Sequence, residues 1–194
     1  MKFYTDSYTH RETKGFVTLA ENIDVSKMVE EINQNIDLFD KYPHRRISFN
    51  SPHAEMTDIW IRTNSPESIG KNWKEVHYPV WYDAAYKLPS IKNFCMDLMA
   101  WTRGESLGHV MITKIPSGGK IEKHNDVHWH AQYFDKFYLQ LQGAEGQTFN
   151  TEHHNFTSKT GDLYWFNNAR EHWVDNNSNI DRITLIICIK IEHD

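Results

Sequence analysis

His124 and Asp126, separated by one residue, have the types and the spacing of a metal-binding pair. They follow the glycines Gly118 and Gly119 and a short extended stretch. Side chains two apart in a strand point to the same face, so the imidazole and the carboxylate would project together. Because divalent metals bind both groups, one more histidine would complete a face of two histidines and one carboxylate. A His-x-Asp pair also occurs by chance, so the prediction depends on further ligands.

His172, far downstream, is the candidate third ligand. Three protein ligands leave three positions of an octahedron open, of which two suit a bidentate 2-oxo acid and one suits dioxygen. Taken singly, each of these residues also fits a polar turn or an ordinary surface position. Taken together, His124, Asp126 and His172 predict a metal that an acidic co-substrate chelates.

Arg182 is the candidate anchor for the far end of that acid, since it opens the apolar stretch 183–189. An arginine at the head of an apolar strand is costly to bury unless it meets an anion. A guanidinium binds a carboxylate through two parallel hydrogen bonds. Lys136 and Tyr138 share one face of a predicted strand and would add donors, as would Thr113, for which ordinary strand packing is the alternative.

Four further side chains are candidates for substrate contact: Trp60, Arg62, His128 and His130. Trp60 and Arg62 lie on one face of a predicted strand, where Arg62 would point either to solvent or to a pocket. His128 and His130 alternate and would also serve as metal ligands in place of His124. Their aromatic neighbours favour a loop over the site instead.

The first half of the chain, residues 1–104, predicts helices and outer strands that would recognise the substrate. The expected elements are strands at 16–20, 44–49 and 57–63, a loop at 65–78, a helix capped by Asp24 or Ser26, and a second helix that Ser90 caps and Gly104 ends.

The second half, residues 105–194, predicts short strands separated by turns. They are expected at 109–115, 120–123, 134–142, 147–152, 161–166, 172–174 and 182–191. Many short strands with regular turns predict a mainly β fold, a double-sheet jelly roll with the helices outside it. The two halves would form one domain, 1–194.

The composition supports one folded domain, because 13% of the 194 residues are aromatic. The formal charge of −5 argues against a general nucleic-acid or membrane-surface binder, and the basic triplet His44-Arg45-Arg46 is interpreted as a surface turn. Cys95 and Cys188 lie in apolar stretches and are expected to be buried free thiols, which suits a reducing cytoplasm. No apolar leader or membrane-spanning stretch is visible, so a soluble, cytoplasmic protein is expected.

Two spacing patterns connect the candidate ligands to a known architecture. Gly118, five residues and then His124-x-Asp126 resembles the first cupin motif, with a carboxylate at its second histidine. The stretch from Gly161 through His172 to Asn176 resembles the second cupin motif, except that Asn167 and Ala169 stand at its usual proline and glycine. Over residues 107–190 the chain resembles Fe(II)/2-oxoglutarate-dependent oxygenases, in particular the aspartyl/asparaginyl β-hydroxylase family. The similarity is carried by residues 108–116, 118–126, 137–141, 161–168, 171–172, 176–177 and 182–186.

This resemblance implies a double-stranded β-helix, a cupin-like jelly roll, with Fe(II) bound by His124, Asp126 and His172 and with 2-oxoglutarate anchored by Arg182. It implies a dioxygenase that uses O2, releases succinate and CO2, and hydroxylates a peptide side chain (Asp/Asn-like) or a small molecule. Ascorbate is a candidate reductant.

Three positions differ from the family pattern. Lys136 stands where the family often has an arginine, and Tyr138 stands where it often has a histidine. Asp126 supplies a metal carboxylate that the best-known animal members lack, which brings the site closer to the wider oxygenase superfamily.

Two alternative functions stay open at the level of sequence. In a metal-dependent cupin enzyme that does not use 2-oxoglutarate, Arg182 would bind the carboxylate of the substrate itself. In a non-catalytic jelly roll, the fold would bind a sugar or a peptide. A nucleic-acid substrate would need base stacking on aromatic side chains, and the acidic balance of the chain disfavours it.

Overall fold

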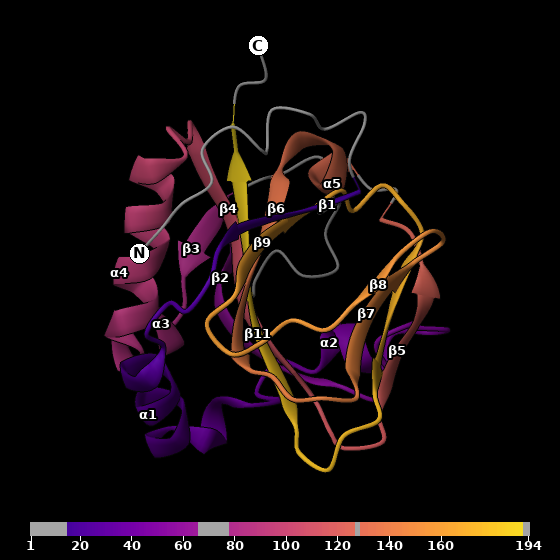
Figure 1. The fold of residues 1–194 in the computed structure, drawn as a ribbon. Helices are drawn as coiled ribbons and strands as arrows, with labels where there is room; N and C mark the ends of the chain where they lie inside the picture. The colour runs from indigo at the N-terminus through magenta and orange to yellow at the C-terminus, as the bar shows by residue number, and fades with distance from the viewer. Residues whose placement is uncertain (1–14, 66–77, 127–128, 192–194) are drawn as a thin grey trace.

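The computed structural model describes residues 15–65, 78–126 and 129–191 of the chain. Its strands form two antiparallel sheets that face each other, and its longer helices cover the outer side of the larger sheet (Figure 1). This arrangement is the predicted mainly β jelly roll with flanking helices, so the expected fold class is confirmed.

The larger sheet consists, from one edge to the other, of β1 (Phe16–Ala20), β9 (Leu163–Phe166), β6 (Asp135–Gln142), β11 (Arg182–Lys190), β4 (Ser106–Ile115), β2 (Thr57–Asn64) and β3 (Pro79–Trp81). The smaller sheet consists of β5 (Lys120–His124), β10 (His172–Asn176), β7 (Gln147–Thr151) and β8 (Asn155–Phe156). The helices are α1 (Ser26–Gln34), the 3-10 turn η1 (Ile36–Leu38), α2 (His44–Ile47), α3 (Ala84–Lys87), α4 (Pro89–Trp101) and α5 (Trp129–Tyr133).

Alternation along the central strands of the larger sheet separates two cores. In β11, Leu185 and Ile187 belong to the aliphatic core under α1, α3 and α4, whereas Thr184 and Ile186 line the space between the sheets. In β6, Leu139 faces the helices in the same way. The core between the sheets is smaller and richer in aromatic side chains: Met56, Ile115, Ile121, Tyr138, Phe149, Tyr164, Phe166 and Val174. The period of two therefore places every second residue of β6 and β11 where a ligand can reach it.

The strand predictions hold for most of the chain. All seven strands expected in residues 105–194 are present, with ends that differ by a few residues, and so are the strands expected at 16–20 and 57–63. The helix expected near Asp24 begins at Ser26, whose N–H and hydroxyl donate to the Asp24 carboxylate at 3.0 and 2.6 Å.

Two local expectations were wrong. Residues 44–49 do not form a strand, because α2 occupies His44–Ile47 and the ion pairs of Arg45 and Arg46 with carboxylates hold this turn in place. Ser90 does not cap the second long helix, which begins one residue earlier at a proline, a residue suited to the first helical turn. The N–H and hydroxyl of Ser90 donate instead to Glu31 of α1, at 3.0 and 2.6 Å, and join the two helices.

Both cysteines are free and buried, as expected. Burial raises the pKa of both thiols, that of Cys188 to about 11, so neither is a thiolate at neutral pH. In the described part of the chain, no helix combines the length and the apolar character needed to cross a bilayer.

Two turns that precede the candidate ligands depend on glycines with positive φ. Gly118, before β5, has φ of 75°, and a Cβ there would meet no atom within 4 Å. Gly161, before β9, has φ of 88°, and a Cβ there would lie 2.6 Å from the carbonyl oxygen of Ile23. The N–H of Ile23 donates to the Gly161 carbonyl at 2.9 Å, so the two backbones are joined and cannot separate easily.

We expect Gly161→Ala to destabilise the protein more than Gly118→Ala does. Positive φ alone costs about 1 kcal/mol at Gly118, whereas Gly161→Ala adds a backbone clash and should cost about 2–4 kcal/mol. Urea denaturation of the two variants and the unaltered protein measures this difference. Equal unfolding free energies for the two variants would contradict the close approach at Gly161.

Candidate metal centre and its cavity

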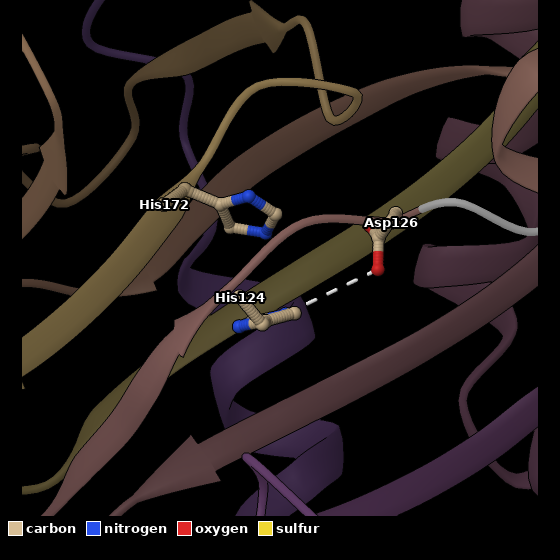
Figure 2. Close-up of side chains that lie close together, drawn as sticks. All are labelled: His124, Asp126 and His172. Carbon is tan, nitrogen blue, oxygen red and sulfur yellow. Dashed lines mark ion pairs between the residues drawn. The ribbon is translucent and has the colours of Figure 1, made fainter.

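The pairing of β5 with β10 brings the two candidate histidines together, because His172 lies opposite His124 in the register of these antiparallel strands. Their ring centroids are 4.3 Å apart. Asp126 follows the end of β5, and its backbone N–H donates at 3.1 Å to the carbonyl of Asn168, just before β10. The three side chains converge in Figure 2, where one possible ligand atom from each lies within 4.8 Å of the others.

Hydrogen bonds to the backbone orient both imidazoles. Nδ1 of His124 donates to the carbonyl of Glu122 at 2.7 Å, and Nδ1 of His172 donates to the carbonyl of Arg170 at 2.8 Å. Since a carbonyl can only accept, each Nδ1 carries the proton in this network and each Nε2 keeps its lone pair. Nε2 of His124 is 4.0 Å from the Asp126 carboxylate. Two nitrogen donors and one oxygen donor therefore face a common point.

The protonation states also suit a metal. Burial lowers the pKa of His172 to about 4 and also lowers the pKa of His124, so both imidazoles are neutral at pH 7. Burial alone would raise the pKa of Asp126, but the charge of Lys136 outweighs this effect and holds the pKa of Asp126 well below its usual range. All three groups are in the form that binds a divalent cation.

The triad opens into a cavity between the sheets. Polar and charged lining residues are Arg45, His53, Thr113, His124, Asp126, Lys136, Tyr138, His172, Arg182 and Thr184, and the apolar lining is Ile121, Phe149, Val174 and Ile186. The mixture of apolar walls with a few convergent polar groups is typical of small-molecule sites.

Arg182, the predicted acid anchor, is 4% exposed at the start of β11 and lines this cavity. Its Nη1 donates to the hydroxyl of Thr184 at 2.6 Å, and its Nη2 donates to the hydroxyl of Tyr164 at 3.1 Å. Among the residues that the structure describes, no carboxylate pairs with it. A buried guanidinium held by two neutral hydroxyls retains most of its desolvation cost, which an anionic ligand would offset.

The other predicted co-substrate contacts also line the cavity. Lys136 forms an ion pair with Asp126, and that carboxylate outweighs the effect of burial and keeps the pKa of the ammonium above its usual value. Tyr138 stacks on Tyr164 with 5.2 Å between ring centroids. Thr113 donates its hydroxyl to Asp58 at 2.9 Å.

The predicted substrate contacts lie elsewhere. Arg62 donates from Nε to the carbonyl of Leu107 at 3.3 Å and lies over the ring of Trp81, with 5.0 Å to the centroid. Trp60 stacks with Tyr42, with 5.5 Å between centroids. None of these side chains is part of the cavity lining.

Of the two histidines predicted to lie over the site, His130 is buried on α5, where its ring stacks on that of His109 with 3.9 Å between centroids. It does not line the cavity. His128 lies outside the described residues.

Among the ionisable residues of the cavity lining, the sequence analysis missed Arg45 of α2 and His53 of the loop before β2. The triplet of residues 44–46 was interpreted as a surface turn, which fits Arg46, paired with Asp40, but not Arg45, whose side chain is 27% exposed. Burial, and then the charge of Arg45, lowers the pKa of His53, so this imidazole is neutral. No spacing or motif indicates either residue, because only the tertiary contact of this loop with β5 brings them here.

Comparison with known proteins agrees with this arrangement. The family model for Aspartyl/Asparaginyl beta-hydroxylase matches residues 43–192. No curated protein matches the chain. An oxidoreductase of the 2OG-Fe(II) oxygenase family from Burkholderia pseudomallei has a similar solved structure, with a TM-score of 0.59, 17% identity and coverage of 95% of this chain and 88% of that one.

Two prolyl hydroxylases share the fold at low identity. The viral collagen prolyl hydroxylase of Paramecium Bursaria Chlorella virus-1 gives a TM-score of 0.53 at 12% identity, over 93% of this chain and 97% of that one. The Pseudomonas putida prolyl-4-hydroxylase gives a TM-score of 0.53 at 13% identity, over 94% and 96%. The chain therefore belongs to the Aspartyl/Asparaginyl beta-hydroxylase family and is a hydroxylase with the fold of 2-oxoglutarate-dependent oxygenases.

Proposed function

We propose that this protein is an Fe(II)- and 2-oxoglutarate-dependent dioxygenase that hydroxylates an Asp/Asn-like side chain of a peptide, or a related small molecule. The balanced reaction consumes the substrate C–H compound, 2-oxoglutarate and O2, and yields the alcohol, succinate and CO2. One observation carries the proposal: three deprotonated candidate ligands line the same cavity as a buried arginine that has no carboxylate partner among the described residues.

The donor set fits iron. His124, Asp126 and His172 present two nitrogens and one oxygen from one side, which is the facial arrangement of non-haem Fe(II) oxygenases. When bound, the iron would supply the activation of O2. The chain's own contribution is to keep both Nε2 atoms unprotonated and aimed at one point, through the two bonds from Nδ1 to the backbone.

The co-substrate would be held by cations of the larger sheet. Arg182 would bind the distal carboxylate of 2-oxoglutarate, with Thr184 and Tyr164 fixing the plane of its guanidinium. Lys136 and Tyr138 line the same wall and are available as further donors.

Apolar walls would protect the reaction. Ile121, Val174 and Ile186 limit the access of water to the cavity, which protects a reactive site from side reactions. Phe149 lies parallel to the ring of His172, with 5.7 Å between centroids and an interplanar angle of 4°, and so restricts the rotation of this ligand.

We expect His172→Ala and Asp126→Ala to weaken metal binding by about 100-fold or more, since even outer-shell changes cost 10–100-fold. Isothermal calorimetry with Mn(II) as an air-stable substitute measures the affinity without turnover. His153→Ala is the matched control, because this histidine is exposed and lies outside the cavity lining. Unchanged Mn(II) affinity in either ligand variant would refute the assigned site.

Loss of Arg182 should abolish the use of 2-oxoglutarate at ordinary concentrations. Removing one partner of a buried charge pair costs about 2–5 kcal/mol, which predicts at least a 10-fold weaker affinity for Arg182→Ala. Anaerobic titration of the Fe(II) protein with 2-oxoglutarate, followed by its visible charge-transfer band, gives this affinity, and succinate release in air gives turnover.

The control for Arg182→Ala is Arg62→Ala, which removes a partly buried arginine of the larger sheet that does not line the cavity. Circular dichroism establishes that both variants fold. If the unaltered protein neither binds 2-oxoglutarate nor releases succinate from it, the proposed function is wrong.

A further inference from the structure

The N-terminal half adds two groups to the cavity that metal and co-substrate binding do not use. Arg45 comes from α2 and His53 from the loop that leads to β2, and both line the cavity beside the metal ligands. The ring of His53 meets that of His124 edge-on, with 4.9 Å between centroids. Nη2 of Arg45 is 3.2 Å from Nε2 of His53. His124, His53 and Arg45 therefore form a continuous row from a candidate metal ligand to a guanidinium.

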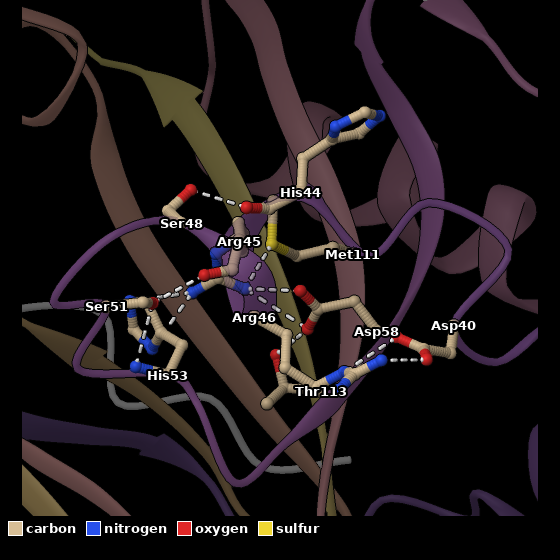
Figure 3. Close-up of polar contacts among 10 residues, drawn as sticks. All are labelled: Asp40, His44, Arg45, Arg46, Ser48, Ser51, His53, Asp58, Met111 and Thr113. Carbon is tan, nitrogen blue, oxygen red and sulfur yellow. Dashed lines mark hydrogen bonds and ion pairs between the residues drawn. The ribbon is translucent and has the colours of Figure 1, made fainter.

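A buried carboxylate of β2 fixes the position of Arg45 (Figure 3). Its Nη1 donates to both carboxylate oxygens of Asp58, at 3.1 and 2.9 Å, and Asp58 is 5% exposed on β2. Thr113 of β4 donates to the same carboxylate at 2.9 Å. Nη1 thus links the guanidinium to Asp58 of β2, and through this carboxylate to Thr113 of the neighbouring strand β4.

Several hydrogen bonds also fix the loop that carries His53. The hydroxyl of Ser51 donates to the carbonyl of Arg45 and accepts from the N–H of His53 at 3.1 Å. The carbonyl of Pro52 accepts from the N–H of Glu122 on β5, at 2.9 Å. Preorganisation of this kind is what a recognition site needs, because side chains that are already fixed lose little entropy on binding.

One edge of the Arg45 guanidinium stays available. Nη1 donates to Asp58 and lies 3.0 Å from the sulfur of Met111. Nη2 carries two hydrogens, of which the contact with His53 at 3.2 Å takes one. Nε and the other N–H of Nη2 form the edge that pairs with a carboxylate through two parallel hydrogen bonds. No residue in the described part of the chain offers an acceptor to Nε. The proposed function assigns an anion to Arg182 and a metal to Asp126, but no partner to this edge.

We propose that Arg45 and His53 form the substrate-recognition wall of the cavity, and that the edge of Arg45 formed by Nε and Nη2 binds a carboxylate of the substrate and selects it over the amide. The inference rests on the proposed function. A carboxylate presents two acceptors to the two N–H groups, whereas an amide presents one acceptor and turns its own NH2 toward a donor. Arg45 is therefore a specificity-determining residue in this account.

The test compares acids with their amides on the complete protein, loaded with Fe(II) and 2-oxoglutarate in the absence of oxygen. Calorimetry with N-acetyl-aspartate amide against N-acetyl-asparagine amide, and with the glutamate and glutamine pair, gives each affinity. We expect at least one acid to bind about 10-fold or more tightly than its amide. Arg45→Gln should weaken the binding of that acid by about 10- to 100-fold and leave the affinity for the amide nearly unchanged.

Two further variants separate recognition from stability. Arg45→Gln leaves Asp58 buried without its cation, so the double variant Arg45→Gln/Asp58→Asn removes both charges and should show the same loss of preference. Arg46→Gln is the matched control, since its guanidinium pairs with Asp40 and does not line the cavity. A role confined to fixing α2 would alter the unfolding free energy without altering the ratio of acid to amide affinity.

The inference is overturned if the unaltered protein shows no preference for an acid, including the case in which it binds no member of either pair. It is also overturned if Arg45→Gln keeps the preference or Arg46→Gln loses it equally. Binding of 2-oxoglutarate in the same samples distinguishes the two proposals: intact binding without acid preference refutes the recognition wall alone, whereas failure to bind 2-oxoglutarate removes the proposed function and the wall with it.

Discussion

The site depends on the antiparallel pairing of β5 with β10. This pairing sets His172 opposite His124, and the hydrogen bond from Asp126 to the carbonyl of Asn168 fixes the carboxylate beside them. Because neighbouring residues of a strand face opposite sides, a slip of the pairing by one residue would remove an imidazole from the cavity. The proposed metal site therefore depends on backbone register more than on any single side-chain contact, because the register brings residues that are far apart in the chain together as one candidate ligand set.

The larger sheet serves two purposes with one set of strands. Aliphatic residues of β6 and β11 pack under the helices. The residues that alternate with them line the space between the sheets and include the charged side chains of Lys136 and Arg182. Burial of Arg182 and Lys136 costs free energy, which the aliphatic core on the other face helps to offset. Lys136 already has Asp126 as its partner, whereas the hydrogen-bond partners of Arg182 in the described part of the chain are hydroxyls. This unequal pairing of the two cations supports Arg182 as the proposed anchor of a ligand acid.

The N-terminal half contributes both to the larger sheet and to the lining of the cavity. Its strands β1, β2 and β3 belong to the larger sheet, and its loop between α2 and β2 forms one wall of the cavity. A buried carboxylate on β2 orients an arginine on α2, so the helix turn and the sheet together present a fixed cation. The proposed recognition wall and the proposed metal ligands thus come from segments that are separate in the sequence but are joined by a backbone hydrogen bond at β5.

The sequence by itself determined the fold class and the strands of the second half, because period-two alternation and turn residues are local patterns that can be read without the structure. Its motifs around His124, Asp126 and His172 resemble those of the family to which the chain belongs. It also pointed to Arg182, since a charge at the head of an apolar strand is anomalous without reference to its neighbours. Only the tertiary structure decided that residues 44–47 form a helix, that Arg45 and His53 enter the cavity, and that Arg62 and His130 do not. The reason is physical: ion pairs and loop contacts between distant segments select one of several conformations that local propensity leaves nearly equal in free energy.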